Sequence, residues 1–164
     1  MAYISPEQRQ AKKEAFDTFI FEIFTTEGWD AITYERISKH FKTTNSSIQR
    51  YYPHRRDFGR ALEGKVFPLV VVHLSFESKK AFIDSWVTAM DDQFFSMVVR
   101  MLIENALVPS TNEKTKGGAQ RLVGAMMQGM TQQEAIEAIE VALGKSVFYH
   151  MNQSFTRISE NNQK

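Results

Sequence analysis

A long amphipathic helix near the N-terminus is the strongest structural signal in the sequence. Its apolar residues recur at i, i+3, i+4, i+7 and i+8, the spacing of one helical face: Phe16, Phe19, Ile20, Ile23 and Phe24. Ser5 can cap the start of this helix, with Pro6 at its first position, and Gly28 can end it. Because one face is apolar, the helix predicted over residues 5–27 must pack against other elements of the chain.

The segment that follows carries the signals of two short helices separated by a tight turn. Thr33 is a good N-cap for the first of them. The stretch KTTNSS is rich in side chains that hydrogen-bond to the backbone, which favours a turn and a new cap at Thr44 or Asn45. Pro53 stops the second short helix. Together with the long first helix, this pattern predicts a helix-turn-helix.

The rest of the sequence is helical in pattern, and we find no strand signal of any length. The expected elements are a helix over 54–76 with a break at Pro68, one bent or two separate helices over 79–108, a loop at 109–112, a helix over 113–130, and a last helix that starts at the capping box of Thr131 and Glu134 and reaches Met151 or beyond. We therefore predict an all-α protein. Residues 1–53 form a helix-turn-helix DNA-binding domain, and residues 54–164 form a helical regulatory and dimerisation domain.

Positive charge is concentrated in one segment of a nearly neutral chain. The whole chain has a formal net charge of +1. Between Arg36 and Lys65, eight basic residues stand against two acidic ones, for a net charge of +6. Such a patch is typical of a surface that binds a phosphate backbone, although a solvated surface can have the same composition.

The second short helix of the motif is predicted to expose polar side chains of the kinds that contact DNA. Ile37, Phe41, Thr43 and Ile48 are spaced to form a small internal cluster. That spacing leaves a set of polar residues and one tyrosine outside: Asn45, Ser46, Ser47, Gln49, Arg50 and Tyr51. Amides and arginine can read base edges in the major groove, and hydroxyl groups can bind phosphates. No carboxylate occurs between Arg36 and Arg56 to repel the phosphates.

This part of the sequence resembles the TetR family of one-component bacterial regulators. The family's order of elements is preserved without a gap from about Ala11 to Leu62. It reads AFDTFIFEIFTTEGW for the long helix that ends in glycine, TYERISKHF for the threonine-capped helix, KTT for the turn, NSSIQRYY for the recognition helix, and PHRRDFGRAL for the break and the following basic helix. The resemblance implies a transcriptional regulator, most often a repressor, that binds double-stranded DNA as a homodimer and responds to a small hydrophobic effector.

The resemblance also implies roles for individual residues. Residues that the resemblance places at phosphates are Thr33, Thr44, Ser47, Tyr51 and Arg55, and those that it places nearest to bases are Asn45, Ser46 and Arg50. Lys42 is expected at a phosphate because of its positive charge. Three positions depart from the family pattern. Ser38 replaces a usual alanine, which is tolerable by size. Lys42 replaces a usual turn glycine, and since a lysine held at positive φ costs about 1 kcal/mol, we expect a slightly different turn. Gln49 replaces a tyrosine that commonly contacts phosphate, and it can donate a hydrogen bond or read an adenine.

The middle helices carry large apolar residues that have two interpretations. They are Phe82, Trp86, Met90, Phe94, Met97 and Met101. By analogy with the family they line an effector pocket, which would be small in so short a domain. Alternatively, they form an ordinary core, because methionine fills irregular gaps in cores as readily as in adaptable pockets.

The last two helices are predicted to form a dimer interface. The last helix has two apolar stripes, one through Ile136, Ile139, Leu143 and Val147 and the other through Ala135, Ala138, Ala142 and Tyr149. One stripe suffices for an intramolecular core, so the second needs a partner surface. The preceding helix has a small-residue edge that permits close approach. The expected interface residues are Gly124, Gly129, Ala138, Ala142 and Tyr149, unless both stripes are buried within the monomer.

Other classes of protein find little support. The absence of cysteine excludes disulfides and thiolate chemistry, and the four histidines have no metal-ligand spacing. No phosphate-binding loop or nucleophile elbow is present, so we expect neither an enzyme nor a metal or cofactor. No signal peptide or membrane span is evident, which predicts a cytoplasmic protein. The alternative function is a helical ligand- or protein-binding module whose helix-turn-helix does not read DNA.

Overall fold

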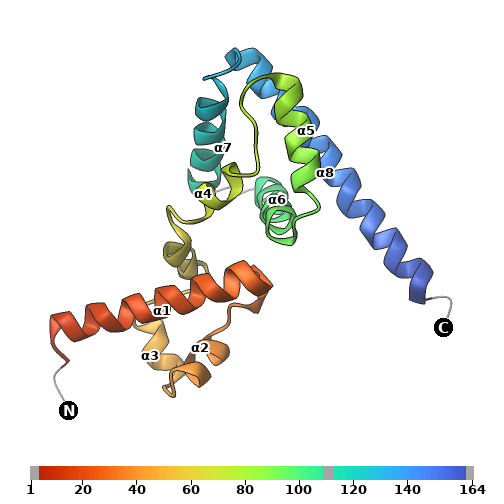
Figure 1. Cartoon of the computed structure of the whole chain (residues 1–164). Helices are drawn as coiled ribbons and strands as arrows, with labels where there is room; N and C mark the ends of the chain where they lie inside the picture. The colour runs from red at the N-terminus through yellow and green to blue at the C-terminus, as the bar shows by residue number, and fades with distance from the viewer. Residues whose placement is uncertain (1–3, 109–112, 162–164) are drawn as a thin grey trace. The chain divides into compact units, whose positions relative to one another are not determined.

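The computed structural model describes residues 4–108 and 113–161, and every regular element within them is a helix (Figure 1). The all-α class predicted from the sequence is therefore confirmed. The chain divides into two compact units, the first ending at Val66 and the second beginning at Phe67. Each unit has a buried core of its own.

Helix α1 of the first unit, Pro6–Glu27, begins and ends where the sequence predicts. Ser5 Oγ accepts a hydrogen bond from Gln8 N at 3.2 Å, and Ser5 N donates to Gln8 Oε1 at 3.0 Å, which completes a capping box. Gly28 ends the helix with φ 93, in the left-handed region where a side chain is strained.

Four short helices follow α1 in the first unit. They are the 3₁₀ helix η1 (Trp29–Ala31), α2 (Tyr34–His40), α3 (Asn45–Gln49) and the 3₁₀ helix η2 (Arg55–Leu62). The core contains Phe16, Ile20, Ile23 and Phe24 from the predicted face of α1, packed with Ile32, Ile37, Ile48, Tyr52 and Phe58. Burying each large apolar side chain contributes about 1.5–3 kcal/mol, so this cluster fixes α2 and α3 against α1. The fifth residue of the predicted face, Phe19, is only half-buried and stacks on His40.

Residues 54–76 are the part of the fold that differs most from the sequence prediction of one helix broken at Pro68. The 3₁₀ helix η2 is followed by a turn in which Gly64 has φ 73, and α4 spans only Val66–Val71. Pro68 lies in the first turn of α4, where the amide proton that proline lacks has no partner within the helix. Proline thus begins this helix and does not break it. The first unit includes residues 54–66, which the sequence analysis assigned to the second domain.

Four longer helices dominate the second unit: α5 (Lys79–Ala89), α6 (Gln93–Ala106), α7 (Glu113–Met126) and α8 (Gln132–Asn161). Two helices therefore occupy 79–108, one of the two arrangements expected, with Asp92 capping α6 by accepting from Phe95 N at 2.8 Å. The capping box of Thr131 and Glu134 starts α8 as predicted. The loop expected at 109–112 lies outside the described residues.

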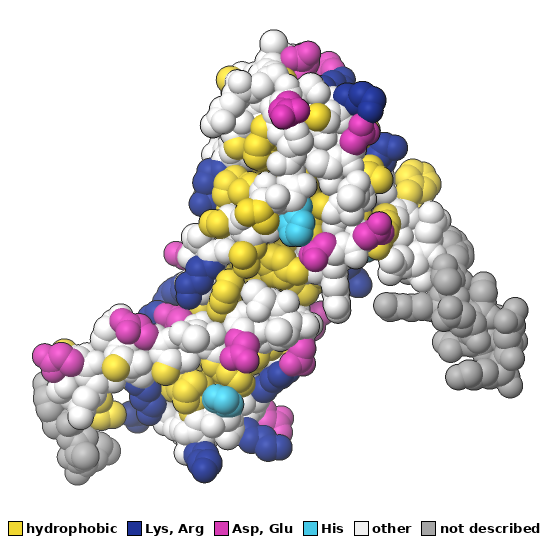
Figure 2. Space-filling view, viewed as in Figure 1, with side chains coloured by type: hydrophobic (Ala, Val, Ile, Leu, Met, Phe, Trp, Pro, Cys, Tyr) yellow, Lys and Arg dark blue, Asp and Glu magenta, His cyan; other side chains and the backbone are white. Residues whose placement is uncertain are grey.

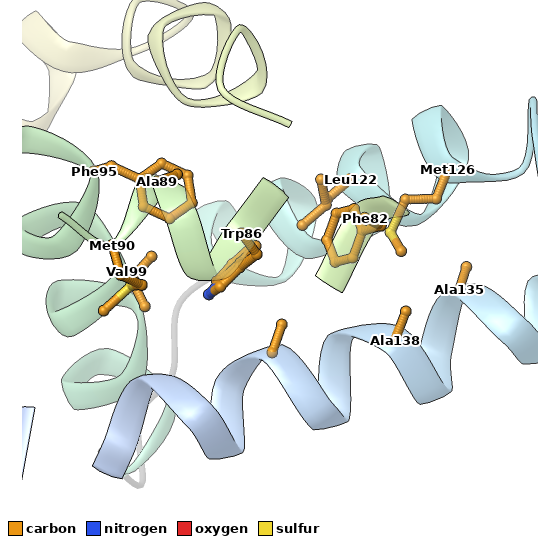
Figure 3. Packing of buried hydrophobic residues seen from close by; sticks show 11 residues of the cluster. Phe82, Trp86, Ala89, Met90, Phe95, Val99, Leu122, Met126, Ala135 and Ala138 are labelled. Atoms are coloured by element: carbon orange, nitrogen blue, oxygen red, sulfur yellow. The ribbon is translucent and has the colours of Figure 1, made fainter. Parts of the chain in front are cut away.

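The core of the second unit forms where α5, α6 and α7 pack against α8 (Figure 3). Phe82 and Trp86 of α5 lie over the alanine-bearing side of α8, where Figure 3 labels Ala135 and Ala138. Ala142 of α8 belongs to the same buried cluster. Trp86 Nε1 donates a hydrogen bond to buried Ser146 Oγ at 2.8 Å, and Ser146 Oγ donates to Ala142 O at 2.8 Å. The small alanine side chains let the two aromatic rings approach the α8 backbone closely.

The face of α8 that turns inward is not the one expected from the sequence. Ala138 and Ala142 have no exposed surface, so the prediction that they lie on a surplus stripe is wrong. Among the α8 residues whose side chains the structure describes, the exposed large apolar ones are instead Ile136, Val141, Val147, Phe148 and Met151. Helix α5 contributes large aromatic side chains to its contact with α8. The stripe of alanines on α8 leaves room for these rings, whereas the stripe through Ile136, Ile139, Leu143 and Val147 would leave less.

Candidate nucleic-acid interface

Two threonine caps define the helix-turn-helix geometry. Thr33 Oγ1 accepts a hydrogen bond from Arg36 N at 3.2 Å and caps α2. Thr44, one of the two predicted candidates, caps α3 by accepting from Ser47 N at 3.2 Å. Thr44 Oγ1 also lies 3.0 Å from Ser47 Oγ in a hydrogen bond. Each hydroxyl satisfies an amide at the start of its helix, which fixes where the short helix begins.

The turn between α2 and α3 keeps a conformation that favours glycine although a lysine occupies it. Lys42 has φ 51, in the left-handed region. The turn closes through a hydrogen bond from Thr43 N to Ser38 O at 2.9 Å. The lysine itself adopts the strained conformation at a cost of about 1 kcal/mol. Its side chain is exposed two residues before Thr44, the cap of α3.

Helix α3 buries one side chain and exposes polar ones. Ile48 is fully buried, whereas Asn45, Ser46, Gln49 and Arg50 are exposed. Ser47 is half-buried beside the cap of the helix. The residue types that the sequence predicts near bases therefore share the outer surface of one short helix.

Asn45 is held by a contact that the sequence analysis did not predict. Its Oδ1 accepts a hydrogen bond from Ser38 Oγ of α2 at 2.7 Å. Ser38 is itself nearly buried, and its hydroxyl also lies 3.0 Å from Glu35 O. The amide nitrogen of Asn45 keeps its two donors for other partners.

Tyr51, just beyond α3, is half-buried against α1. Its ring packs edge-on against Phe16, with the ring centroids 5.3 Å apart. The neighbouring Tyr52 is fully buried, and its hydroxyl donates a hydrogen bond to Asp17 of α1. The C-terminal end of the recognition helix is therefore fixed to α1 by two adjacent tyrosines.

Arg55 has several partners within the first unit. Its Nη2 donates to Trp29 O at 3.1 Å and lies 3.4 Å from Asp30 Oδ1, and its Nε lies 3.4 Å from Ile32 O. The guanidinium carbon lies 5.4 Å from the centroid of the Trp29 ring. Arg55 thus holds the η1 turn beside α2, and 46% of its side chain remains exposed. Sequence reasoning missed this structural contact because its partners lie more than twenty positions away.

Basic side chains surround the motif. In Figure 2, Lys and Arg side chains lie around α2 and α3, below α1 in that view. Arg36 forms an ion pair with Glu27, and the pKa of the Glu27 carboxyl is lowered by this hydrogen bond. Among the described residues, no ion pair involves Lys39, Lys42, Arg50 or Arg56, so their charges are available to a bound anion.

The residues predicted to form an effector pocket fall into two groups. Phe82, Trp86 and Met90 are buried in the core of the second unit, whereas Phe94, Met97 and Met101 are half-buried on α6. An open hollow of about 360 Å³ lies between α6 and α8. It is lined by residues other than the predicted ones: Arg100, Ile103, Glu104, Val147, His150, Met151 and Gln153. A pocket among the predicted residues stays a prediction.

The remaining predicted interface residues are in different environments. Gly124 is exposed on α7, and Tyr149 is half-buried against the core. Gly129 is packed so closely that a Cβ atom there would lie 1.9 Å from Phe76 O. Because Gly129 has no side chain, its backbone can pack directly against the backbone of Phe76 within the second unit.

Two classes of site have no counterpart in the described part of the chain. Its His, Asp and Glu side chains form no group of three that could hold a metal ion. None of its helices is both long enough and apolar enough to span a bilayer.

An all-helical chain with a threonine-capped helix-turn-helix and a separate helical unit belongs to the class of helix-turn-helix regulators. The family model of the tetracycline repressor LuxT C-terminal domain matches residues 63–149, more than half of the chain. The protein belongs to the tetracycline repressor family, TetR, which confirms the resemblance inferred from its first 62 residues. This is a family of transcriptional repressors and not of enzymes, as the sequence analysis expected. No curated protein matched the chain.

Proposed function

We propose that this protein is a cytoplasmic transcriptional repressor that binds a palindromic or pseudo-palindromic DNA operator as a homodimer. A small hydrophobic effector would release it from the operator. Family membership supports the general class of regulator. The finer assignment depends on the surface of α3 and on the outer face of α8.

The exposed surface of α3 is the observation that carries the proposal. Asn45, Ser46, Gln49 and Arg50 are exposed together on a helix whose only fully buried side chain is Ile48. A solvated helix of no further function usually has Glu and Lys at helix-favouring spacing. Here the surface consists of amides, a hydroxyl and an arginine, which are the groups that read base edges in the major groove.

The surrounding residues would hold α3 in the groove. Hydroxyl, phenol and cationic groups flank it on both sides, and we assign phosphate contacts to Thr33, Lys42, Thr44, Ser47, Tyr51 and Arg55. Both threonines cap helices, so their positions are fixed before DNA arrives. Asn45, Ser46, Gln49 and Arg50 are assigned to the bases.

A homodimer would bring two copies of α3 to one side of the duplex. Two recognition helices must lie about one helical turn apart, roughly 34–36 Å, to read a palindromic site. Exposed apolar side chains on α8 supply a surface for this: Ile136, Val141, Val147, Phe148 and Met151. Phe148 is 66% exposed. We therefore assign the dimer contact to this outer face of α8 and not to its alanine stripe.

The effector is assigned to the predicted pocket residues of the middle helices. Phe94, Met97 and Met101 are half-buried on α6, and Phe82, Trp86 and Met90 belong to the buried core of the same unit. Methionine and aromatic side chains suit a small apolar ligand because they adapt to its shape.

A mobility-shift assay on random-sequence duplex at two salt concentrations tests the proposal. DNA bound through phosphates is released steeply by salt, with a log–log slope of roughly −0.9 per phosphate neutralised. Selection from a randomised duplex pool should then enrich a two-fold symmetric site. No binding at low salt, or binding without salt dependence, would favour the alternative module that does not read DNA.

A further inference from the structure

The N-terminal half of α1 carries cations beside the recognition helix that the assignments above do not use. The guanidinium carbon of Arg9 lies 5.8 Å from the centroid of the Tyr51 ring. Lys12 Nζ lies 5.8 Å from the centroid of the Phe16 ring, against which Tyr51 packs edge-on. The Tyr51 ring is therefore in contact with both Arg9 and Phe16 of the same helix.

The spacing of these residues puts positive charge on one face of α1. Arg9, Lys12 and Phe16 follow one another at i, i+3 and i+7, so their side chains lie along one line of the helix. Glu7 stands two residues before Arg9, and Glu14 stands five residues after it. Both positions fall on a different side of α1 from the line of Arg9, Lys12 and Phe16. The face that meets Tyr51 is thus basic, and the acidic residues of this half of α1 point elsewhere.

The charges of Arg9 and Lys12 are not neutralised within the described part of the chain. No ion pair involves either residue, whereas the third cation of this region, Lys13, is paired with Asp17 at 2.6 Å. A phosphate bound by the Tyr51 hydroxyl would lie on the order of one Debye length, about 8 Å, from Arg9. At that distance salt screens the attraction only in part.

We propose that α1 is part of the DNA interface, with Arg9 and Lys12 contacting phosphates next to the one bound by Tyr51. This inference rests on the proposed DNA binding of α3 and extends the interface beyond the helix-turn-helix. Arg9 has a second role in this interface, because its guanidinium stacks on the Tyr51 ring and so orients the phenol. Contacts of this kind strengthen binding to all sequences about equally.

The test measures the dissociation constant of the full chain on a labelled random-sequence duplex across a salt series. Arg9→Gln and Lys12→Gln should each reduce the magnitude of the log–log salt slope by about 0.9, and the double variant by about 1.8. Arg9→Lys keeps the charge and should keep the slope. The matched control is Lys80→Gln, which removes one exposed charge from α5 in the second unit and should leave the slope unchanged.

Each other outcome has a definite meaning. A steep slope in the wild type that is unchanged in Arg9→Gln/Lys12→Gln would overturn the role of α1 and leave the proposed function intact. An Arg9→Lys variant that loses as much slope as Arg9→Gln would also overturn the phosphate contact. A wild type whose binding does not depend on salt would overturn the proposed function and this inference together. Circular dichroism melting of each variant checks that the first unit stays folded.

Discussion

The hydroxyl of Tyr52, just past the recognition helix, donates a hydrogen bond to the carboxylate of Asp17 in the middle of α1. Lys13 Nζ completes this group at 2.6 Å from the other carboxylate oxygen of Asp17. Burial and the hydrogen bond to Asp17 together raise the pKa of Tyr52 well above its usual range. The position of α3 therefore depends on a partly buried polar contact as well as on apolar packing.

Replacing Tyr52 with phenylalanine should destabilise the first unit by about 1–3 kcal/mol, because Asp17 loses a buried donor. The wild type should also lose stability as the pH rises above about 10, since the unfolded chain releases the phenol proton there while the folded chain retains it. The Tyr52→Phe variant should lose less folding stability than the wild type as the pH rises. Denaturant melts at neutral and alkaline pH measure both effects. Equal alkaline sensitivity in the two proteins would contradict the role of Tyr52.

Arg50 and Arg55 should differ in what they contribute to DNA binding. Arg50→Ala should weaken binding to a selected operator by about 1–3 kcal/mol more than binding to random DNA, because a base contact discriminates between sequences. Arg55→Ala should weaken both about equally. It should also lower the melting temperature, since Arg55 holds the η1 turn through Trp29 O. Competition assays with the two duplexes measure the ranking, and the reverse ranking would mean that α3 is wrongly placed in the groove.

Gly129→Ala should destabilise the second unit by more than about 1 kcal/mol, because the new methyl group would meet Phe76 O at 1.9 Å and the backbone must shift. Gly118→Ala is the matched control. It lies inside α7 with no atom within 4 Å of the added Cβ, and it should stabilise by about 0.5–1 kcal/mol through helix propensity. Thermal unfolding of both variants tests this. An unaffected Gly129→Ala would mean that the close approach to Phe76 is absent in solution.

Two arginine substitutions on α8 should separate dimerisation from folding. Phe148→Arg changes a side chain that is 66% exposed, so it should yield a folded monomer that no longer binds the operator. Ala142→Arg places a charge where no surface is exposed, so it should unfold the second unit. Sedimentation together with circular dichroism distinguishes these results. A dimeric Phe148→Arg protein would exclude the outer face of α8 as the interface.

Local signals predicted most of the helix boundaries. The ends of α1, the caps of α2 and α3 and the start of α8 each depend on residues within four positions of the boundary, such as Ser5, Thr33 and Thr44. Residues 54–76 were harder to predict because a proline such as Pro68 can either lie in the first turn of a helix or interrupt a helix, and the local sequence is compatible with both. Their 3₁₀ segment places Phe58, Ala61 and Leu62 at i, i+3 and i+4, which is also the spacing of an α-helical face.

Contacts between distant residues explain what the sequence did not reveal about the site. Arg55 and Trp29 lie far apart in the sequence, and so do Arg9 and Tyr51. The inward stripe of α8 could not be chosen from α8 alone, since both of its stripes are apolar. The choice depends on Phe82 and Trp86 of α5, whose size requires the small side chains of the alanine stripe.

The hydrogen bond from Ser38 to Asn45 bears on how tolerant this regulator is of changes in its target site. An asparagine on a bare helix surface can rotate to suit different bases, and it loses about 0.5–1.5 kcal/mol of rotamer freedom when it binds. Here the Asn45 amide is already oriented by Ser38 before it meets DNA. Because the Asn45 side chain is already restrained, it would lose less entropy on binding a base whose hydrogen-bonding groups match this orientation. In the proposed DNA complex, every other base at that position would meet an amide that cannot easily turn, so a single buried hydroxyl on α2 would narrow the range of operators that α3 accepts.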